Sequence, residues 1–144
     1  MVQRGIAHCL LSLYGNRQNH AELLTPGLQI LTAIQDTPDS ETQSMIAGCL
    51  HHLSEYRENH ADLLITGLQL LNAIQATPEI YAQRRIAGCL FHLSQDPEKH
   101  AVLLTTGLPI LSALQATQGD PRGLIAACLR RLFSSPANPC CVVM

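Results

Sequence analysis

The sequence predicts an all-α fold of stacked helices, and three observations support this prediction. A segment of about 40 residues recurs along the chain, which is typical of repeat architectures. Hydrophobic residues make up 47% of the 144 positions, yet the aromatic ones are only three Tyr and two Phe. The apolar content is therefore mainly Leu, Ile and Ala, and these residues recur at helical spacing. We therefore expect helices packed on helices around a continuous core.

Two short patterns define the period. An Ile-Ala-x-Cys-Leu pattern occupies residues 6–10, 46–50, 86–90 and, one residue early, 125–129. A His-Ala-x-Leu-Leu pattern occupies residues 20–24, 60–64 and 100–104, and a Gly-Leu pair follows each copy. The sequence therefore predicts an array over residues 1–133. It begins with one orphan helix, about residues 2–14, and continues with three units at about 16–54, 56–94 and 96–133.

Each unit is expected to contain three helices, described here for the middle unit. The first is short, roughly residues 57–65. Gly67 then breaks the chain, because Gly tolerates the backbone angles of a sharp corner. The second helix begins near Leu68 and carries apolar residues at helical spacing.

The third helix of the middle unit follows a polar turn. Thr77 is expected to cap it and Pro78 to occupy its first position, where no amide donor is needed. Thr37-Pro38 and Asp120-Pro121 repeat this arrangement. The helix runs to about Ser94, with an apolar stripe facing the core.

The segments at residues 85–94, 97–100 and 103–111 together resemble the armadillo repeat. That family shows an Ala-Leu-x-Asn-Leu-Ser-like end of its third helix, an Asn-x-x-x-Leu first helix, and a Gly before its second helix. HEAT repeats are the nearest alternative, but they lack the short first helix and the Gly corner. The resemblance covers residues 2–133 and implies a right-handed α-solenoid whose third helices line a concave, protein-binding groove.

In peptide-binding armadillo proteins, a ladder of Asn residues and a ladder of Trp residues run along this groove. The positions that match the Asn ladder here are Ser12, His52, His92 and Arg131. The positions that match the Trp ladder are His8, Gly48, Gly88 and Ala127. Neither ladder is present, so the resemblance implies a wide, partly imidazole-lined groove. A helical or globular partner, or a tightly packed neighbour, fits such a groove better than an extended peptide.

The last eleven residues, 134–144, are predicted to be a flexible tail with a lipidation signal. Residues 134–139, Ser-Ser-Pro-Ala-Asn-Pro, cannot extend a helix and form a spacer. Cys141, two valines and a terminal Met match the Cys-aliphatic-aliphatic-X prenylation rule, and Met favours farnesyl. A chance ending is the alternative. One lipid chain binds membranes only weakly, so Cys140 is either a second, palmitoylated site or an unmodified neighbour.

Several classes of function are not expected from the composition and motifs. The net charge of −2, with 14% charged residues, does not fit a nucleic-acid binder. No signal peptide, no apolar run of membrane-spanning length and no phosphate-binding loop is present. The repeated cysteines are interpreted as buried packing thiols in a reducing compartment. The seven His are interpreted as core or surface residues, because zinc-ligand spacing is absent. No catalytic residue, metal or cofactor is predicted.

The sequence therefore predicts a non-catalytic adaptor or scaffold that binds a protein partner in its groove. A prenyltransferase would modify Cys141, and the lipid would tether the protein to a cytoplasmic membrane face. Two alternatives remain open. The chain is either the C-terminal fragment of a longer armadillo scaffold or a bacterial effector that uses host prenylation.

Overall fold

The chain is all-helical in a computed structural model that describes residues 2–115 and 121–134. No β-strand occurs within these residues, so the predicted all-α class is confirmed. The α-helices are α1 (Val2–Tyr14), α2 (His20–Ala33), α3 (Ser40–Ser54), α4 (His60–Asp62), α5 (Leu68–Ile74), α6 (Ile80–Leu93), α7 (His100–Val102), α8 (Leu108–Gln115) and α9 (Pro121–Ser134). Short 3₁₀ segments are η1 (Arg17–Asn19), η2 (Arg57–Asn59) and η4 (Pro97–Lys99), and π-helical segments are η3 (Leu63–Gly67) and η5 (Leu103–Gly107).

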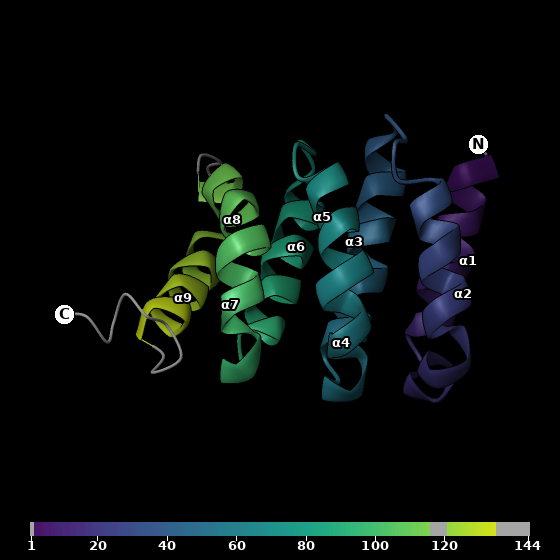
Figure 1. Cartoon of the computed structure of the whole chain (residues 1–144). Coiled ribbons are helices and arrows are strands. Elements are labelled where there is room, and N and C mark those ends of the chain that lie inside the picture. Colours follow the sequence, from purple (N-terminus) through teal and green to yellow (C-terminus); the bar gives the residue numbers. More distant parts are fainter. Residues whose placement is uncertain (1, 116–120, 135–144) are drawn as a thin grey trace.

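The helices stand side by side in two rows (Figure 1). One row contains α1, α3, α6 and α9: α3 contacts α1 and α6, and α6 contacts α9. The other row contains α2, then α4 with α5, then α7 with α8 (Figure 1). Segments about 40 residues apart in the sequence therefore lie next to one another.

The core is formed by apolar side chains from both rows. Leu31, Leu71 and Leu111 come from the row of α2, α5 and α8, and each is at most 1% exposed. Leu50 and Leu90 come from α3 and α6 and are fully buried. All five belong to one cluster of buried residues, so the helices share a single continuous core.

The expected corner at the repeated glycines is wrong. Gly27 lies inside α2, and the chain passes through Gly67 with helical angles of φ −61° and ψ −43°. The first and second helices of each later unit are instead joined through a π-helical turn, η3 or η5. Gly27 and Gly67 instead leave space for neighbouring side chains. A Cβ on Gly27 would overlap the hydroxyl of Tyr14, and one on Gly67 would lie 3.0 Å from Cδ2 of Leu63.

The predicted helix starts are shifted at α3 and α6, whereas α9 begins at Pro121 as predicted. The helix α3 begins after Asp39, whose carboxylate accepts from the Thr42 backbone N–H at 3.1 Å. Thr37 does not cap the helix, because its hydroxyl accepts from the backbone N–H of Asp39 at 3.2 Å in the preceding turn. Thr77 does the same for Glu79 at 3.3 Å. The Thr-Pro pair therefore shapes the turn, and the helix begins two residues later than predicted.

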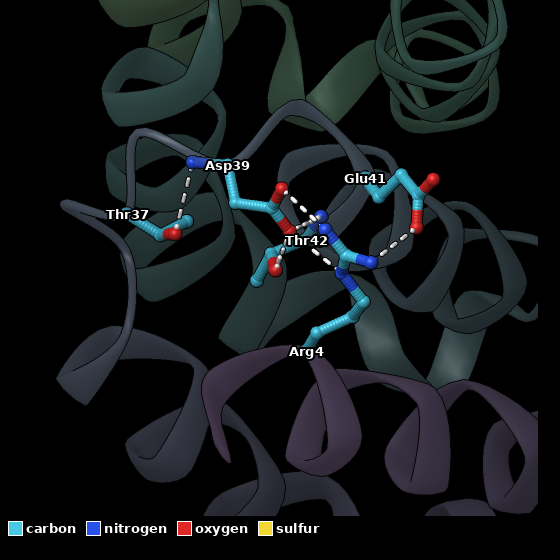
Figure 2. A network of polar contacts seen from close by, with 5 residues as sticks. All are labelled: Arg4, Thr37, Asp39, Glu41 and Thr42. Carbon is cyan, nitrogen blue, oxygen red and sulfur yellow. Dashed lines mark hydrogen bonds and ion pairs between the residues drawn. The ribbon is translucent and has the colours of Figure 1, made fainter. Parts of the chain in front are cut away.

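A charged network ties the start of α3 to α1 (Figure 2). The guanidinium of Arg4 donates to both carboxylate oxygens of Asp39, at 2.8 and 3.0 Å, and lies 3.2 Å from Glu41. The Thr42 hydroxyl donates to the same Asp39 at 2.6 Å. One carboxylate thus caps α3 and pairs with the neighbouring helix.

This network predicts an acid-sensitive contribution to stability. Hydrogen bonds from Arg4 and from Thr42 hold the pKa of Asp39 well below its ordinary value of 3.8. A carboxyl group whose pKa is lowered by folding stabilises the fold fully above its unfolded pKa. It begins to lose that effect as the pH falls below the unfolded pKa and has lost it once the pH falls through the lower, folded pKa. We expect Asp39→Asn, which retains an acceptor for the cap, to lower the melting temperature at pH 7. The difference from the wild type should narrow between pH 5 and pH 3.

The matched control is Glu79→Gln. Glu79 precedes α6 as Asp39 precedes α3, but its side chain makes no capping hydrogen bond. The same change of charge should therefore leave the melting temperature nearly unchanged at both pH values. A difference between the wild type and Asp39→Asn that stays constant across this range would contradict the role given to the ionised carboxylate.

Candidate protein-binding surface

The predicted groove positions lie on the row of α1, α3, α6 and α9. Ser12 is on α1, His52 on α3, His92 on α6 and Arg131 on α9. Ser12 is exposed, and the other three are half-buried. The helix order therefore places these positions along one row, although no contact joins Ser12 to the others among the described interactions.

Imidazole rings from α3 and α6 lie close together. The ring of His51 is 5.4 Å from that of His92 and 6.3 Å from that of His52, measured between centroids. Glu55 lies beside this group, with its Oε1 3.5 Å from Nδ1 of His52 and 4.0 Å from Nδ1 of His51. The structure therefore brings His52 and His92 into one group through His51.

An aromatic ring extends this group towards α9. The Phe91 ring is 6.0 Å from the His92 ring, and the Arg131 guanidinium carbon lies 4.6 Å from the centroid of Phe91. This distance is that of a cation–π contact. We call the set of His51, His52, Phe91, His92 and Arg131 the histidine patch.

Gly48 and Gly88 do not line an open groove as predicted. Both are buried, and side chains from neighbouring helices cover them. A Cβ on Gly88 would lie 2.8 Å from Cδ2 of His51, and one on Gly48 would lie 2.8 Å from Cδ1 of Leu11 and 3.1 Å from Nη1 of Arg85. Because these glycines have no side chain, side chains of the adjacent helices can pack directly against the backbone at Gly48 and Gly88.

The imidazoles at the centre of the patch favour the neutral form. Burial lowers the pKa of His51, and the nearby His92 lowers it further, while Glu55 opposes these effects. Burial also lowers the pKa of His92. Protonating both rings would place two positive charges side by side, and Arg85 lies near His51, so both rings favour the uncharged form near neutral pH.

The cysteines on this row are packing groups rather than reactive ones. Cys49, Cys89 and Cys128 are buried, as predicted. Burial raises the pKa of the Cys49 and Cys89 thiols to about 12 and also raises that of Cys128, so all three stay protonated. Cys9 differs from the prediction because it is exposed. The helix α1 packs through Ala7, Leu10 and Tyr14, and Cys9 lies on another side of it.

Sequence reasoning missed His51 and Phe91 as surface residues of this row. Each directly precedes a predicted position, so the adjacent pairs 51–52 and 91–92 were the available signal. In residues 2–115 and 121–134, no three His, Cys, Asp or Glu side chains lie close enough to hold a metal ion. The rings of the patch pack against one another at tilted or edge-on angles, and the chemistry that they offer is recognition of another surface.

Two comparisons of the sequence with known proteins found no match. No protein-family model matches the chain, and no curated protein is significantly similar to it. None of the described helices has both the length and the apolar character needed to cross a bilayer. The lipidation positions predicted at Cys140 and Cys141 lie outside the described residues.

Proposed function

We propose that the chain is a non-catalytic adaptor or scaffold that binds a protein partner. The observation that carries this proposal is the histidine patch: aromatic and imidazole rings and an Arg side chain, half-buried, on three adjacent helices. Aromatic residues and Arg are the types enriched at the centres of protein interfaces. Rings that are already packed against one another lose little conformational entropy on binding.

We also propose that the two rows form a short α-solenoid of armadillo type, with a right-handed superhelix. Residues 1–133 would be the array, with units at about 16–54, 56–94 and 96–133. Contacts between helices about 40 residues apart support this proposal. Because η3 and η5 join the first and second helices of the later units, these units also resemble the two-helix pattern of HEAT repeats, which have a similar repeat length.

The shape of the patch favours a broad partner surface. Leu11 and Arg85 cover Gly48, and His51 covers Gly88, so the slots that a Trp ladder would line are occupied. Asn amides that would clamp an extended peptide backbone are also absent from the patch. A helical or globular partner, which meets the row through side chains, therefore fits better than an extended peptide.

The tail supplies the second half of the proposed function. Prenylation of Cys141 by a prenyltransferase would tether the protein to a cytoplasmic membrane face. The segment from Ser134, the last residue of α9, to Cys141 spans at most roughly 25 Å. A lipid at this position would therefore hold the helical array, and any partner bound to it, close to the bilayer.

The test of the binding proposal is a charge change in the patch. We expect His52→Glu/His92→Glu to lose at least about tenfold of the binding to specific partners, because it places two charges where a partner must desolvate the surface. Partners would be captured from cell extract on the immobilised full chain and quantified by mass spectrometry.

The matched control for this test is Gln69→Glu on α5, an exposed position in the other row. It should retain every partner that the wild type retains, and circular dichroism should report the same helix content for all three proteins. Equal retention by the double variant and the control would exclude the histidine patch as the binding surface.

A further inference from the structure

A cavity of about 280 Å³ lies where the turn after α3 meets the turn after α6. Its walls are Glu55, Arg57, His60, Gln95, Asp96 and Pro97. We call this place the second junction. The first junction is the corresponding place one period earlier, where residues 14–20 meet residues 54–59. Comparing the two junctions shows why the cavity exists.

At the first junction, a tyrosine ring fills the space. The ring of Tyr56 meets the ring of His20 edge-on, with centroids 5.5 Å apart and planes at 69°. The guanidinium carbon of Arg17 lies 4.1 Å from the centroid of Tyr56. The tyrosine ring is therefore held between an imidazole edge and a cation, two contacts that favour aromatic rings.

The imidazole at the first junction is also fully hydrogen-bonded. Nε2 of His20 lies 2.7 Å from the carbonyl oxygen of Tyr14. The side-chain amide of Asn59 lies 3.1 Å from Nδ1 of His20. Because an amide nitrogen donates, Nδ1 is the acceptor and Nε2 carries the hydrogen.

At the second junction, two of these four groups are kept and two are replaced. Arg57 and His60 stand where Arg17 and His20 stand one period earlier. Asp96 replaces the tyrosine, and Lys99 replaces the asparagine. Replacing a ring by a short carboxylate side chain opens the cavity.

The second imidazole lacks one hydrogen bond that the first one has. Nε2 of His60 lies 2.7 Å from the carbonyl oxygen of Ser54, as in the first junction. Its Nδ1 is buried without a hydrogen-bond partner, and the residue is only 4% exposed. A buried acceptor without a donor is unfavourable. His60 lines the cavity, so a ligand that brings a donor to its Nδ1 would gain a hydrogen bond.

We propose that the second junction binds a phenol group, with the phenol ring in the place that the Tyr56 ring occupies at the first junction. The phenol comes either from a small molecule or from a tyrosine side chain of a partner protein. The volume suffices, because a cavity of roughly 150 Å³ can hold benzene. This site does not depend on the function proposed above, because it rests on the comparison of the two junctions.

The groups around the cavity select this ligand chemistry. Nη2 of Arg57 lies 3.3 Å from the Asp96 carboxylate, and the side chain is 76% exposed. At the first junction, Arg17 pairs with Glu58 and lies over the Tyr56 ring at the same time, so an ion pair does not prevent Arg57 from lying over an incoming ring. The phenol hydroxyl can donate to Nδ1 of His60 or to the carboxylate of Asp96. Glu55 and Asp96 carry negative charge, so they disfavour a phosphorylated tyrosine or a carboxylate ligand.

The test is a titration of the full chain with four probes, followed by NMR at the imidazole of His60 and by calorimetry. We expect p-cresol and N-acetyl-tyrosinamide to saturate at millimolar concentrations. N-acetyl-phenylalaninamide, which lacks the hydroxyl donor, should bind roughly five- to tenfold more weakly, in line with one lost hydrogen bond. The phosphotyrosine amide should show no saturable binding. Tighter binding of the tyrosine amide than of p-cresol indicates a protein side chain as the ligand, and the reverse order indicates a small molecule.

Three variants locate the binding. Asp96→Tyr should fill the cavity with its own ring and abolish probe binding, whereas Gln18→Tyr, which adds a ring at an exposed position of the first junction, should leave it unchanged. Arg57→Ala removes the exposed cation together with its ion pair to Asp96 and should weaken binding several-fold. The proposal is overturned if no phenol saturates the His60 signal, or if the affinity is the same in Asp96→Tyr as in the wild type.

Discussion

Replacing Gly27 with alanine is expected to lower the free energy of unfolding by about 1–3 kcal/mol, the usual cost of overpacking a core. A Cβ at this position would overlap the hydroxyl of Tyr14 and lie 2.7 Å from Cζ of the same ring. Tyr14 has little freedom to move away. It is 1% exposed, and its hydroxyl donates to the carbonyl oxygen of Leu23 at 2.6 Å. Urea unfolding followed by circular dichroism measures the change.

Gly107→Ala is the matched control, because Gly107 occupies the same repeat position two periods later. A Cβ there would meet its nearest neighbour, Cδ2 of Leu103, at 3.4 Å, an ordinary van der Waals distance. Alanine costs less conformational entropy than glycine in a helix, so this variant should gain up to about 1 kcal/mol. The two substitutions are therefore expected to have opposite signs. A stabilising Gly27→Ala would show that the close approach to Tyr14 is not what fixes the glycine.

A double-variant cycle identifies the group that collides. Tyr14→Phe removes the hydroxyl and should itself cost stability, because the carbonyl of Leu23 loses its donor. Adding Gly27→Ala to Tyr14→Phe should then cost less than adding it to the wild type. Equal costs in the two backgrounds would place the collision elsewhere.

The sequence was sufficient to predict the helical class and most of the helix positions. The orphan helix, predicted at about residues 2–14, is α1, and the third helix of the middle unit, predicted to end near Ser94, is α6, which ends at Leu93. These predictions rest on apolar periodicity, which depends on local sequence alone. The role of Gly27 cannot be predicted from local sequence, because a repeated glycine is compatible with either a corner or a close approach. Only the position of Tyr14, on another helix, decides between them.

The candidate site was predictable to a similar extent. Register along the repeat was enough to select His52, His92 and Arg131. It did not reveal that His51 reaches across to Gly88 and packs at a tilted angle beside His92, because that contact depends on how α3 and α6 are packed. The cavity at the second junction also depends on contacts between neighbouring units. The replacement of Tyr56 by Asp96 is visible in the sequence, but its consequence requires the contacts of Tyr56 with its neighbours.

Replacing Cys141 with serine is expected to abolish farnesyl incorporation completely. In the proposed reaction, the Cys141 thiol loses its proton and the thiolate sulfur attacks the first carbon of farnesyl diphosphate. A thioether forms, and diphosphate leaves. A serine hydroxyl is far less acidic and a poorer nucleophile under the same conditions, so no partial activity should remain. Purified farnesyltransferase with labelled farnesyl diphosphate and the full chain gives the measurement. Incorporation into Cys141→Ser equal to that in the wild type would exclude prenylation at this position.

Cys140→Ser is the matched control, because it removes the adjacent thiol and leaves the Cys-Val-Val-Met sequence unchanged. It should accept farnesyl as the wild type does. Its membrane behaviour then separates one lipid from two. A single chain with an association constant of roughly 10⁴ M⁻¹ needs about 0.1 mM accessible lipid for half-binding, so such a protein exchanges on and off the bilayer. If Cys140 is acylated in cells, Cys140→Ser should remain farnesylated yet move from the membrane fraction to the cytosol. If it stays in the membrane fraction, farnesyl must be assisted by another contact, and a partner bound at the histidine patch is the first candidate.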